Sequence, residues 1–297
     1  MKNKTFYLIF GAAALVLFSA PLRKLLALSF HNELYSHIIL LPLVSGYFLF
    51  MQRKEIFEGA RYAPVAGVPL IAAGIALYLM GADRNGVLNN NDYLSIMICS
   101  FLVIMVGGFI FFYGIQSFKI ASFPLLFLAF TVPLPNAVME SLIHFLRVGS
   151  THGASALFKA IGIPYAREGY CFYLPNLSIE VAEECSGIRS SLSLVITAII
   201  AGHLFLTSKR RKIVLVMFAI PIAVLKNSIR IVTLSLLTIY VDHRVLSSPL
   251  HHKGGVLFFV IGLLLLGAVL WALRKSEGRE NKGRTPLETG APAEDKG

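Results

Sequence analysis

Long apolar runs divided by short basic clusters are the feature that most constrains this chain. About eight runs approach the length needed to cross a hydrocarbon core of roughly 30 Å: residues 5–22, 38–51, 64–81, 94–115, 120–135, 186–207, 213–240 and 254–273. Of the 297 residues, 56% are hydrophobic and only 14% are charged, which is too apolar for a soluble globular protein. The chain is therefore predicted to be an all-α, polytopic transmembrane helical bundle of about eight spans.

Lys and Arg residues gather at one set of ends of these runs. Clusters at residues 1–4, 209–212 and 274–275 fall on one side of the membrane when the runs are taken in order. Because positive charge is retained on the cytoplasmic side, both termini are predicted to be cytoplasmic and the chain to lie in the cytoplasmic (inner) membrane. Only Arg23 and Lys24 argue against this orientation. The net charge of +11 comes without a basic-aromatic motif, so nucleic acid is not expected as a partner.

Two stretches between the spans have patterns of their own. Residues 136–163 mix charged and apolar residues at helical spacing, which predicts helices that lie in the interface or pack as short pieces. Residues 164–184 alternate in polarity and are broken by Gly and Pro, which predicts a small hairpin-like loop outside the bilayer. We expect one transmembrane domain over residues 1–275 and a disordered cytoplasmic tail over residues 276–297.

The hairpin-like loop leads to Cys185, where the next apolar run begins. The topology places Cys185, Arg230 and His251 at the same outer face of the membrane. A thiolate is a nucleophile, a guanidinium stabilises an oxyanion and an imidazole transfers protons, so the three suit covalent catalysis on a carbonyl group. Each also has an ordinary explanation, as a packed cysteine, a snorkelling arginine and a juxtamembrane histidine. His252 is an alternative base.

Other residues bear on the reactivity of Cys185. Glu184 opposes formation of a thiolate, so activation has to come from cations or from the start of the helix. Arg189 is four residues after Cys185, on the same helical face, either as a second cation or as the partner of a glutamate. Cys171 is also outside, where a disulfide bond to Cys185 would silence the nucleophile. Cys99, inside an apolar run, is expected only to pack.

Several motifs resemble the exosortase/archaeosortase family, and the resemblance extends across most of the apolar part of the chain. The motifs are Tyr35-Ser36-His37, Val181-Ala182-Glu183-Glu184-Cys185-Ser186-Gly187-Ile188-Arg189-Ser190, Asn227-Ser228-Ile229-Arg230 and His251 with Gly255 four places on. The resemblance implies a multi-pass cysteine transpeptidase that recognises a C-terminal sorting signal on exported proteins. In the bacterial branch this signal (PEP-CTERM) is a short Pro-Glu-Pro motif, a transmembrane helix and a basic end.

The resemblance also implies roles for individual residues. The family's nucleophile, which forms an acyl thioester, falls on Cys185, and its arginine falls on Arg230. Its histidine falls on His251 rather than His252, because only His251 has a glycine four places on. Asn227 and His37 belong to resembling motifs and are expected to support the site, His37 by lining the substrate path.

Neither a metal nor another cofactor is expected, because the chain has no His-Glu-x-x-His, Cys-x-x-Cys or glycine-rich nucleotide motif. The expected partners are exported proteins with the sorting signal, the lipid bilayer and an exopolysaccharide or lipid-linked acceptor. Two alternatives remain open. One is a transporter or flippase for polysaccharide or lipid intermediates, which intramembrane charges such as Lys226 and Arg230 also suit. The other is a non-catalytic assembly factor for export.

Overall fold

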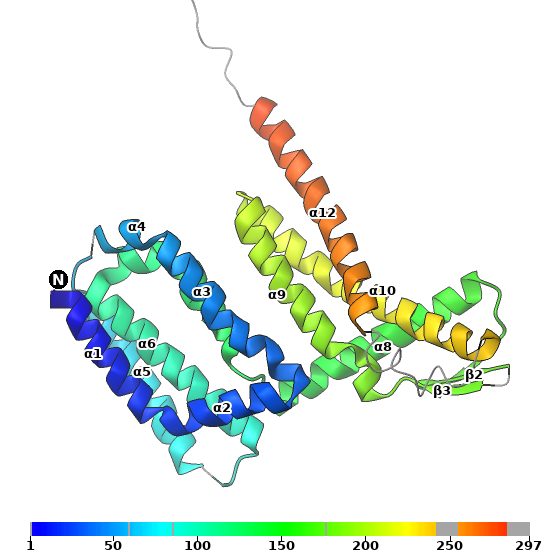
Figure 1. The fold of residues 1–297 in the computed structure, drawn as a ribbon, viewed down its shortest axis with the longest axis horizontal. Helices are drawn as coiled ribbons and strands as arrows, with labels where there is room; N and C mark the ends of the chain where they lie inside the picture. The colour runs from blue at the N-terminus through cyan, green and yellow to red at the C-terminus, as the bar shows by residue number, and fades with distance from the viewer. Residues whose placement is uncertain (1, 59, 85, 176, 242–254, 284–297) are drawn as a thin grey trace, which may run out of the picture. The chain divides into compact units, whose positions relative to one another are not determined.

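The computed structural model describes residues 2–58, 60–84, 86–175, 177–241 and 255–283 (Figure 1). The chain divides into two compact units, Met1–Ser141 and Leu142–Gly297. Among the described residues, six helical segments are long and apolar enough to cross a membrane, and two bent helix pairs bring the number to eight if each is one span. The chain is an all-α polytopic membrane protein, as its composition predicted.

The first unit is built around one long helix, α6, against which α1, α2, α4 and α5 pack. Small residues bring α5 close to α6, as is common between membrane helices. A Cβ on Gly67 would lie 2.5 Å from the Cβ of Phe111, and one on Gly74 would lie 2.5 Å from Ile104. The elements of this unit are α1 (Lys2–Leu17), α2 (Ser19–His31), the 3-10 helix η1 (Glu33–Ile39), α3 (Leu40–Met51), α4 (Arg53–Glu58), α5 (Pro64–Asp83), α6 (Asn90–Ile120), α7 (Ser122–Phe127), the 3-10 helix η2 (Leu128–Thr131) and the start of α8 (Asn136–Ala160).

Two predicted spans in this unit differ from the structure. The run at residues 5–22 is divided between α1 and α2, which meet at 71°. Pro21 has no N–H to donate to the carbonyl of Leu17, and Phe18 is fully buried at the bend, so the chain turns there. Arg23, one of the two residues that argued against the predicted orientation, lies within α2. The run at residues 120–135 forms only α7 and η2, which meet α8 at 88°.

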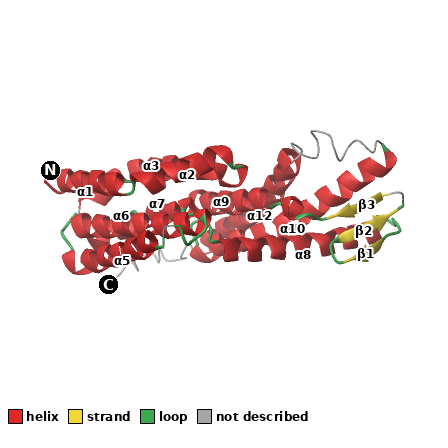
Figure 2. Cartoon of the chain, turned by 90° about the horizontal axis from the view of Figure 1, so that it is seen from below, coloured by secondary structure: helices red, strands yellow, loops and turns green. Residues whose placement is uncertain are grey.

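The second unit contains the carboxyl-terminal part of α8, a small sheet and three long helices. The predicted hairpin-like loop is a three-stranded antiparallel sheet in the order β1-β2-β3 (Figure 2). Residues 136–163, predicted to form short pieces or to lie in the interface, form the single helix α8 up to Ala160. The elements after α8 are β1 (Ala166–Glu168), β2 (Cys171–Leu174), β3 (Leu177–Glu180), the 3-10 helix η3 (Glu183–Ser186), α9 (Ile188–Phe205), α10 (Lys209–Tyr240) and α12 (Gly255–Gly283).

Two hydrophobic clusters hold this unit together. One face of the sheet packs on α8 and α10, through Phe158, Phe172 and Val181 among others. The helices α9, α10 and α12 pack side by side around a second cluster that includes Leu194 and Leu215 (Figure 1). The helix α10 is continuous through Pro221, although the sequence left open whether residues 213–240 form one helix or two.

A buried carboxylate, Glu277 of α12, marks one end of this helix group. It accepts hydrogen bonds from the hydroxyl of Thr207 at 2.6 Å and from the backbone N–H of Ser208 at 2.7 Å, and it pairs with Arg211 at 3.3 Å. Ser208 directly precedes α10, so Glu277 satisfies a backbone donor at the start of that helix. The basic residues 209–212 and the end of α12 are therefore neighbours. At a rise of about 1.5 Å per residue, Asn227 lies about 22 Å along α10 from Lys212.

Candidate active site

Cys185 lies in η3, the short turn between the sheet and α9. Its backbone N–H donates to the carbonyl of Ala182 at 3.0 Å. Gly187, two residues on, has a φ of +73°, a conformation that L side chains rarely adopt. A Cβ on Gly187 would lie 2.9 Å from Oδ1 of Asn227. Glycine is therefore required here twice, by the backbone conformation and by the closeness of α10.

Asn227 fixes this turn from α10. Its Nδ2 donates to the carbonyl oxygen of Cys185 at 2.9 Å and to Oγ of Ser150, on α8, at 3.0 Å. The side chain of Asn227 is only 2% exposed, so these bonds are made away from bulk solvent. The backbone of Cys185 is thus held by a residue of another helix, and that helix is in turn bonded to α8.

Lys226, the residue before Asn227, holds the other side of the turn. The hydroxyl groups of Ser190 and Ser191 both donate to the carbonyl of Gly187, at 3.0 and 2.8 Å. The ammonium of Lys226 donates to Oγ of Ser190 at 2.5 Å, and the residue is 2% exposed. Burial of a charged lysine is costly unless its ammonium is hydrogen-bonded, and here Oγ of Ser190 accepts such a bond. Sequence reasoning connected Lys226 only with transport, because nothing in the sequence links it to Ser190.

The helices α8 and α10 approach each other closely beside these contacts. A Cβ on Gly153 of α8 would lie 2.2 Å from Oγ of Ser228, and one on Gly149 would lie 3.2 Å from Val224. The hydroxyl of Ser228 also donates to the carbonyl of Ser150 at 3.1 Å. Small residues on α8 therefore allow the backbone-level contact that brings Ser150 to Asn227.

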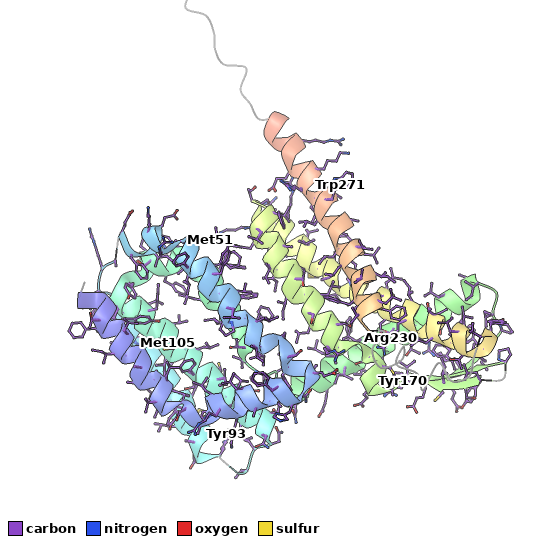
Figure 3. All side chains as sticks on the ribbon, viewed as in Figure 1. Met51, Tyr93, Met105, Tyr170, Arg230 and Trp271 are labelled. Atoms are coloured by element: carbon purple, nitrogen blue, oxygen red, sulfur yellow. The ribbon has the colours of Figure 1, made fainter. Side chains whose placement is uncertain are left out.

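A pocket of about 50 Å³ lies beside the turn, where β3 meets α10. Cys185 and Arg230 both line it, and both are partly buried. Figure 3 labels Arg230 on α10. The rest of the lining is mostly apolar, and consists of Ile179, Glu180, Val181, Ile231, Leu234 and Ser235. A thiol and a guanidinium in one small apolar pocket have the parts for attack on a carbonyl carbon and for stabilisation of the resulting oxyanion.

Arg147 of α8 anchors the strand that leads to this pocket. Its guanidinium donates to the carbonyl of Val181, pairs with Glu180 at 2.9 Å and lies 3.8 Å from the ring centroid of Tyr170. The hydroxyl of Tyr170 is 3.2 Å from Nδ1 of His144, also on α8. Arg147 was not among the residues selected from the sequence, because there it is only one of several charged residues in the amphipathic segment 136–163.

The remaining candidate residues are placed as follows. Arg189 is exposed in the first turn of α9, and one of its guanidinium nitrogens lies 3.9 Å from the position of a Cβ on Gly255, where α12 begins. His37 is in η1 of the first unit. The side chain of Glu184 and both His251 and His252 lie outside the described residues.

The other two cysteines and the potential metal ligands were also candidates for a role at the site. Cys171, in β2, and Cys185 are not joined by a disulfide bond, and Cys99 lies within α6. Among the residues that the structure describes, no group of three or more His, Cys, Asp or Glu side chains could hold a metal ion.

Comparison with known proteins gave one match. A family model described as transmembrane exosortase matches residues 29–268, a range that includes the sheet, Cys185, Arg230 and His251. Neither the curated proteins nor the solved structures gave a match.

Proposed function

This chain belongs to the transmembrane exosortase family, and from that premise we propose that it is a membrane-embedded cysteine peptidase or transpeptidase. It cleaves the C-terminal sorting signal of exported proteins and transfers them to an acceptor. The observation that carries the proposal is the shared pocket of Cys185 and Arg230, which are far apart in sequence. A thiol supplies the nucleophile, and a nearby guanidinium can stabilise the oxyanion, so the pair suits acyl transfer through a thioester.

The proposed reaction has two halves. His251 takes the proton of Cys185, and the sulfur attacks the carbonyl carbon of the scissile peptide bond while Arg230 stabilises the oxyanion. The C–N bond then breaks, the leaving amine takes the proton from His251, and a thioester remains on Cys185. In the second half an amine or water attacks the thioester, gives its proton to His251 and releases the acyl group. The sulfur of Cys185 leaves as a thiolate and takes the proton back from His251, which restores both groups to their starting state.

The turn itself supplies rigidity to this mechanism. Asn227 bonds the carbonyl of Cys185, and Lys226 bonds Ser190 in the first turn of α9, so the nucleophile is held from both sides. Fixed geometry of this kind lowers the barrier by removing the need to orient the reacting groups during the reaction.

The orientation in the membrane is also part of the proposal. The basic residues 209–212 are beside the end of α12, and the Cys185 turn is bonded to Asn227, about 22 Å farther along α10. Positive charge favours the cytoplasmic side, so we place both termini inside and the pocket at the outer, periplasmic face of the cytoplasmic membrane. The proposed substrates carry a PEP-CTERM type signal, and the acceptor is an exopolysaccharide or lipid-linked amine.

Replacement of Cys185 tests this function. We expect Cys185→Ala, made in the native host, to leave proteins with the sorting tail uncleaved in the membrane. Cys171→Ala is the matched control, because it removes a partly buried thiol from the neighbouring strand, and processing should continue. If processing also continues in Cys185→Ala, the peptidase proposal is wrong, and the transporter or assembly-factor alternatives gain support.

Detection of the intermediate separates acyl transfer from a scaffold role. The expected result is a hydroxylamine-sensitive adduct between Cys185 and a reporter protein that carries the sorting tail. Added amines should shorten the lifetime of this adduct if the enzyme is a transpeptidase. Arg230→Ala should reduce formation of the adduct by roughly 10²–10³-fold, the usual effect of losing one oxyanion donor. An adduct that forms at the normal rate without Arg230 would contradict the role proposed for that residue.

A further inference from the structure

The strand β3 is at one edge of the sheet, on the side of α10 (Figure 2). Phe172 pairs with Ile179 and Tyr173 with Ser178, and the N–H of Val181 donates to the carbonyl of Tyr170. In an antiparallel pair, hydrogen-bonded and non-hydrogen-bonded positions alternate. The backbone groups of Leu177, Ile179 and Val181 therefore point toward β2. Those of Ser178 and Glu180 point outward, away from the sheet.

These outward groups are open for a ligand. The register leaves the N–H and carbonyl of Ser178 and the N–H of Glu180 out of the ladder to β2, and within the described part of the chain no backbone group outside the sheet bonds to them. The carbonyl of Glu180 accepts from the N–H of Ala182 at 3.0 Å. Both Ser178 and Glu180 are exposed. An unpaired strand edge of this kind is a template for another extended chain.

The open edge leads directly to the nucleophile. Ile179, Glu180 and Val181 line the same pocket as Cys185 and Arg230. A chain paired with β3 would lie about 4.8 Å from it, the normal spacing between strands. Its backbone would run past the pocket, and alternate side chains would face the apolar wall formed by Ile231 and Leu234.

We infer that the enzyme binds its substrate by β-strand addition: the extended segment around the scissile bond pairs with the outer edge of β3 and is carried by that edge to Cys185. This inference rests on the proposed function. The ligand is the main chain of a polypeptide, recognised through the N–H and C=O of Ser178 and the N–H of Glu180. Arg147 is a positioning residue in this scheme, because its bonds to Glu180 and Val181 hold the edge in place.

A proline in β3 tests the pairing without removing any side-chain contact of the pocket. Ser178→Pro deletes an outward N–H, whereas the ladder to β2 does not use that group. The assay follows the processing of a reporter fused to the tail of a surface protein of the same host. We expect the processing rate to fall about two- to tenfold, which corresponds to the loss of one hydrogen bond. Ser178→Ala keeps the N–H and is the matched control, with normal processing expected. The level of folded protein in the membrane is measured for both.

Crosslinking decides the question even if the proline variant folds poorly. Ser178→Cys is combined with Cys185→Ala, which leaves the substrate uncut, and single cysteines are placed along the reporter's cleavage region. Disulfide bonds are expected at reporter positions two residues apart, because only alternate residues of an added strand face the same way. Tyr173→Cys is the control. It is opposite Ser178 on β2 and is also exposed, but it is one strand farther from the edge.

The outcomes separate this inference from the function on which it rests. Absence of crosslinks, or crosslinks with no alternation, overturns strand addition, as does normal processing by Ser178→Pro. The proposed function then stands as long as Cys185→Ala abolishes cleavage. If Cys185→Ala cleaves normally, both proposals are wrong.

Discussion

Loss of the Asn227 side chain should slow the reaction more than it destabilises the fold. Asn227→Ala removes the donor to the Cys185 carbonyl and the donor to Ser150. A buried polar group left without a partner costs about 1–3 kcal/mol. The pocket beside Cys185, at about 50 Å³, has the volume for a water molecule that could bond the carbonyl, and the hydroxyl of Ser150 can rotate, so we expect a loss in the free energy of unfolding near the lower end, about 1–2 kcal/mol.

The effect on the reaction should be larger than the effect on stability. Without Asn227 the carbonyl of Cys185 loses its bond to α10, and a displacement of the nucleophile by about 1 Å can lower a rate by about 10²-fold. Asn227→Asp should be at least as severe, because it puts an acceptor 2.9 Å from the Cys185 carbonyl oxygen, where a donor now lies. The assay is the rate of thioester formation on Cys185, measured beside the thermal unfolding midpoint of the purified protein.

Ser150→Ala is the matched control for this prediction. It removes the other acceptor of Asn227 and keeps the bond to Cys185, so it should lower stability by about 1 kcal/mol and leave the rate within a few-fold of normal. If Asn227→Ala forms the thioester at the normal rate, or if Ser150→Ala slows it equally, the turn is not positioned by Asn227 and the reasoning fails.

Three further substitutions test other contacts. Gly187→Ala should lower the free energy of unfolding by about 1–2 kcal/mol for the left-handed conformation alone, and more through its contact with Asn227, with a parallel loss of processing; a neutral variant would contradict the geometry. Lys226→Met should raise the free energy of unfolding by up to about 4 kcal/mol, because it replaces with an apolar side chain a buried ammonium whose hydrogen bond, among the described residues, is to Ser190; a lower unfolding midpoint would refute this. Glu277→Gln should cost about 1.5–3 kcal/mol of stability, the value of hydrogen bonds to a charged acceptor, with the thioester rate unchanged because the contact is at the other end of α10.

The sequence predicts the fold class and the approximate position of spans such as α5 and α6, although not the kink at Gly114 within α6. The helices α5 and α6 contain the expected runs because hydropathy reports length and polarity, which the bilayer dictates. Hydropathy carries no information on bend angle, so the break at Phe18 and the turn into α8 were missed. The sheet before Cys185 was visible in outline, since alternation and turn residues are local signals, but its third strand was not.

The candidate site was predictable only in part for the same reason. Topology brought Cys185 and Arg230 to one depth, and the structure places both in one pocket. Contacts across helices, such as Asn227 with Ser150 and Lys226 with Ser190, join residues with no periodic relation in the sequence. Such pairs appear only once tertiary packing is known.

The close seam between α8 and α10 restricts how a substrate can reach the site. A helix packed against another needs an axis separation of about 8–10 Å, and Gly153 and Ser228 already leave no room for a single Cβ. A substrate's transmembrane helix therefore cannot pass between α8 and α10, and this side of the site is closed to the lipid. Lateral entry from the lipid must occur along another side of α10. Gly153→Leu would push α8 and α10 apart and should disable the enzyme, although residue 153 contacts none of the reacting atoms.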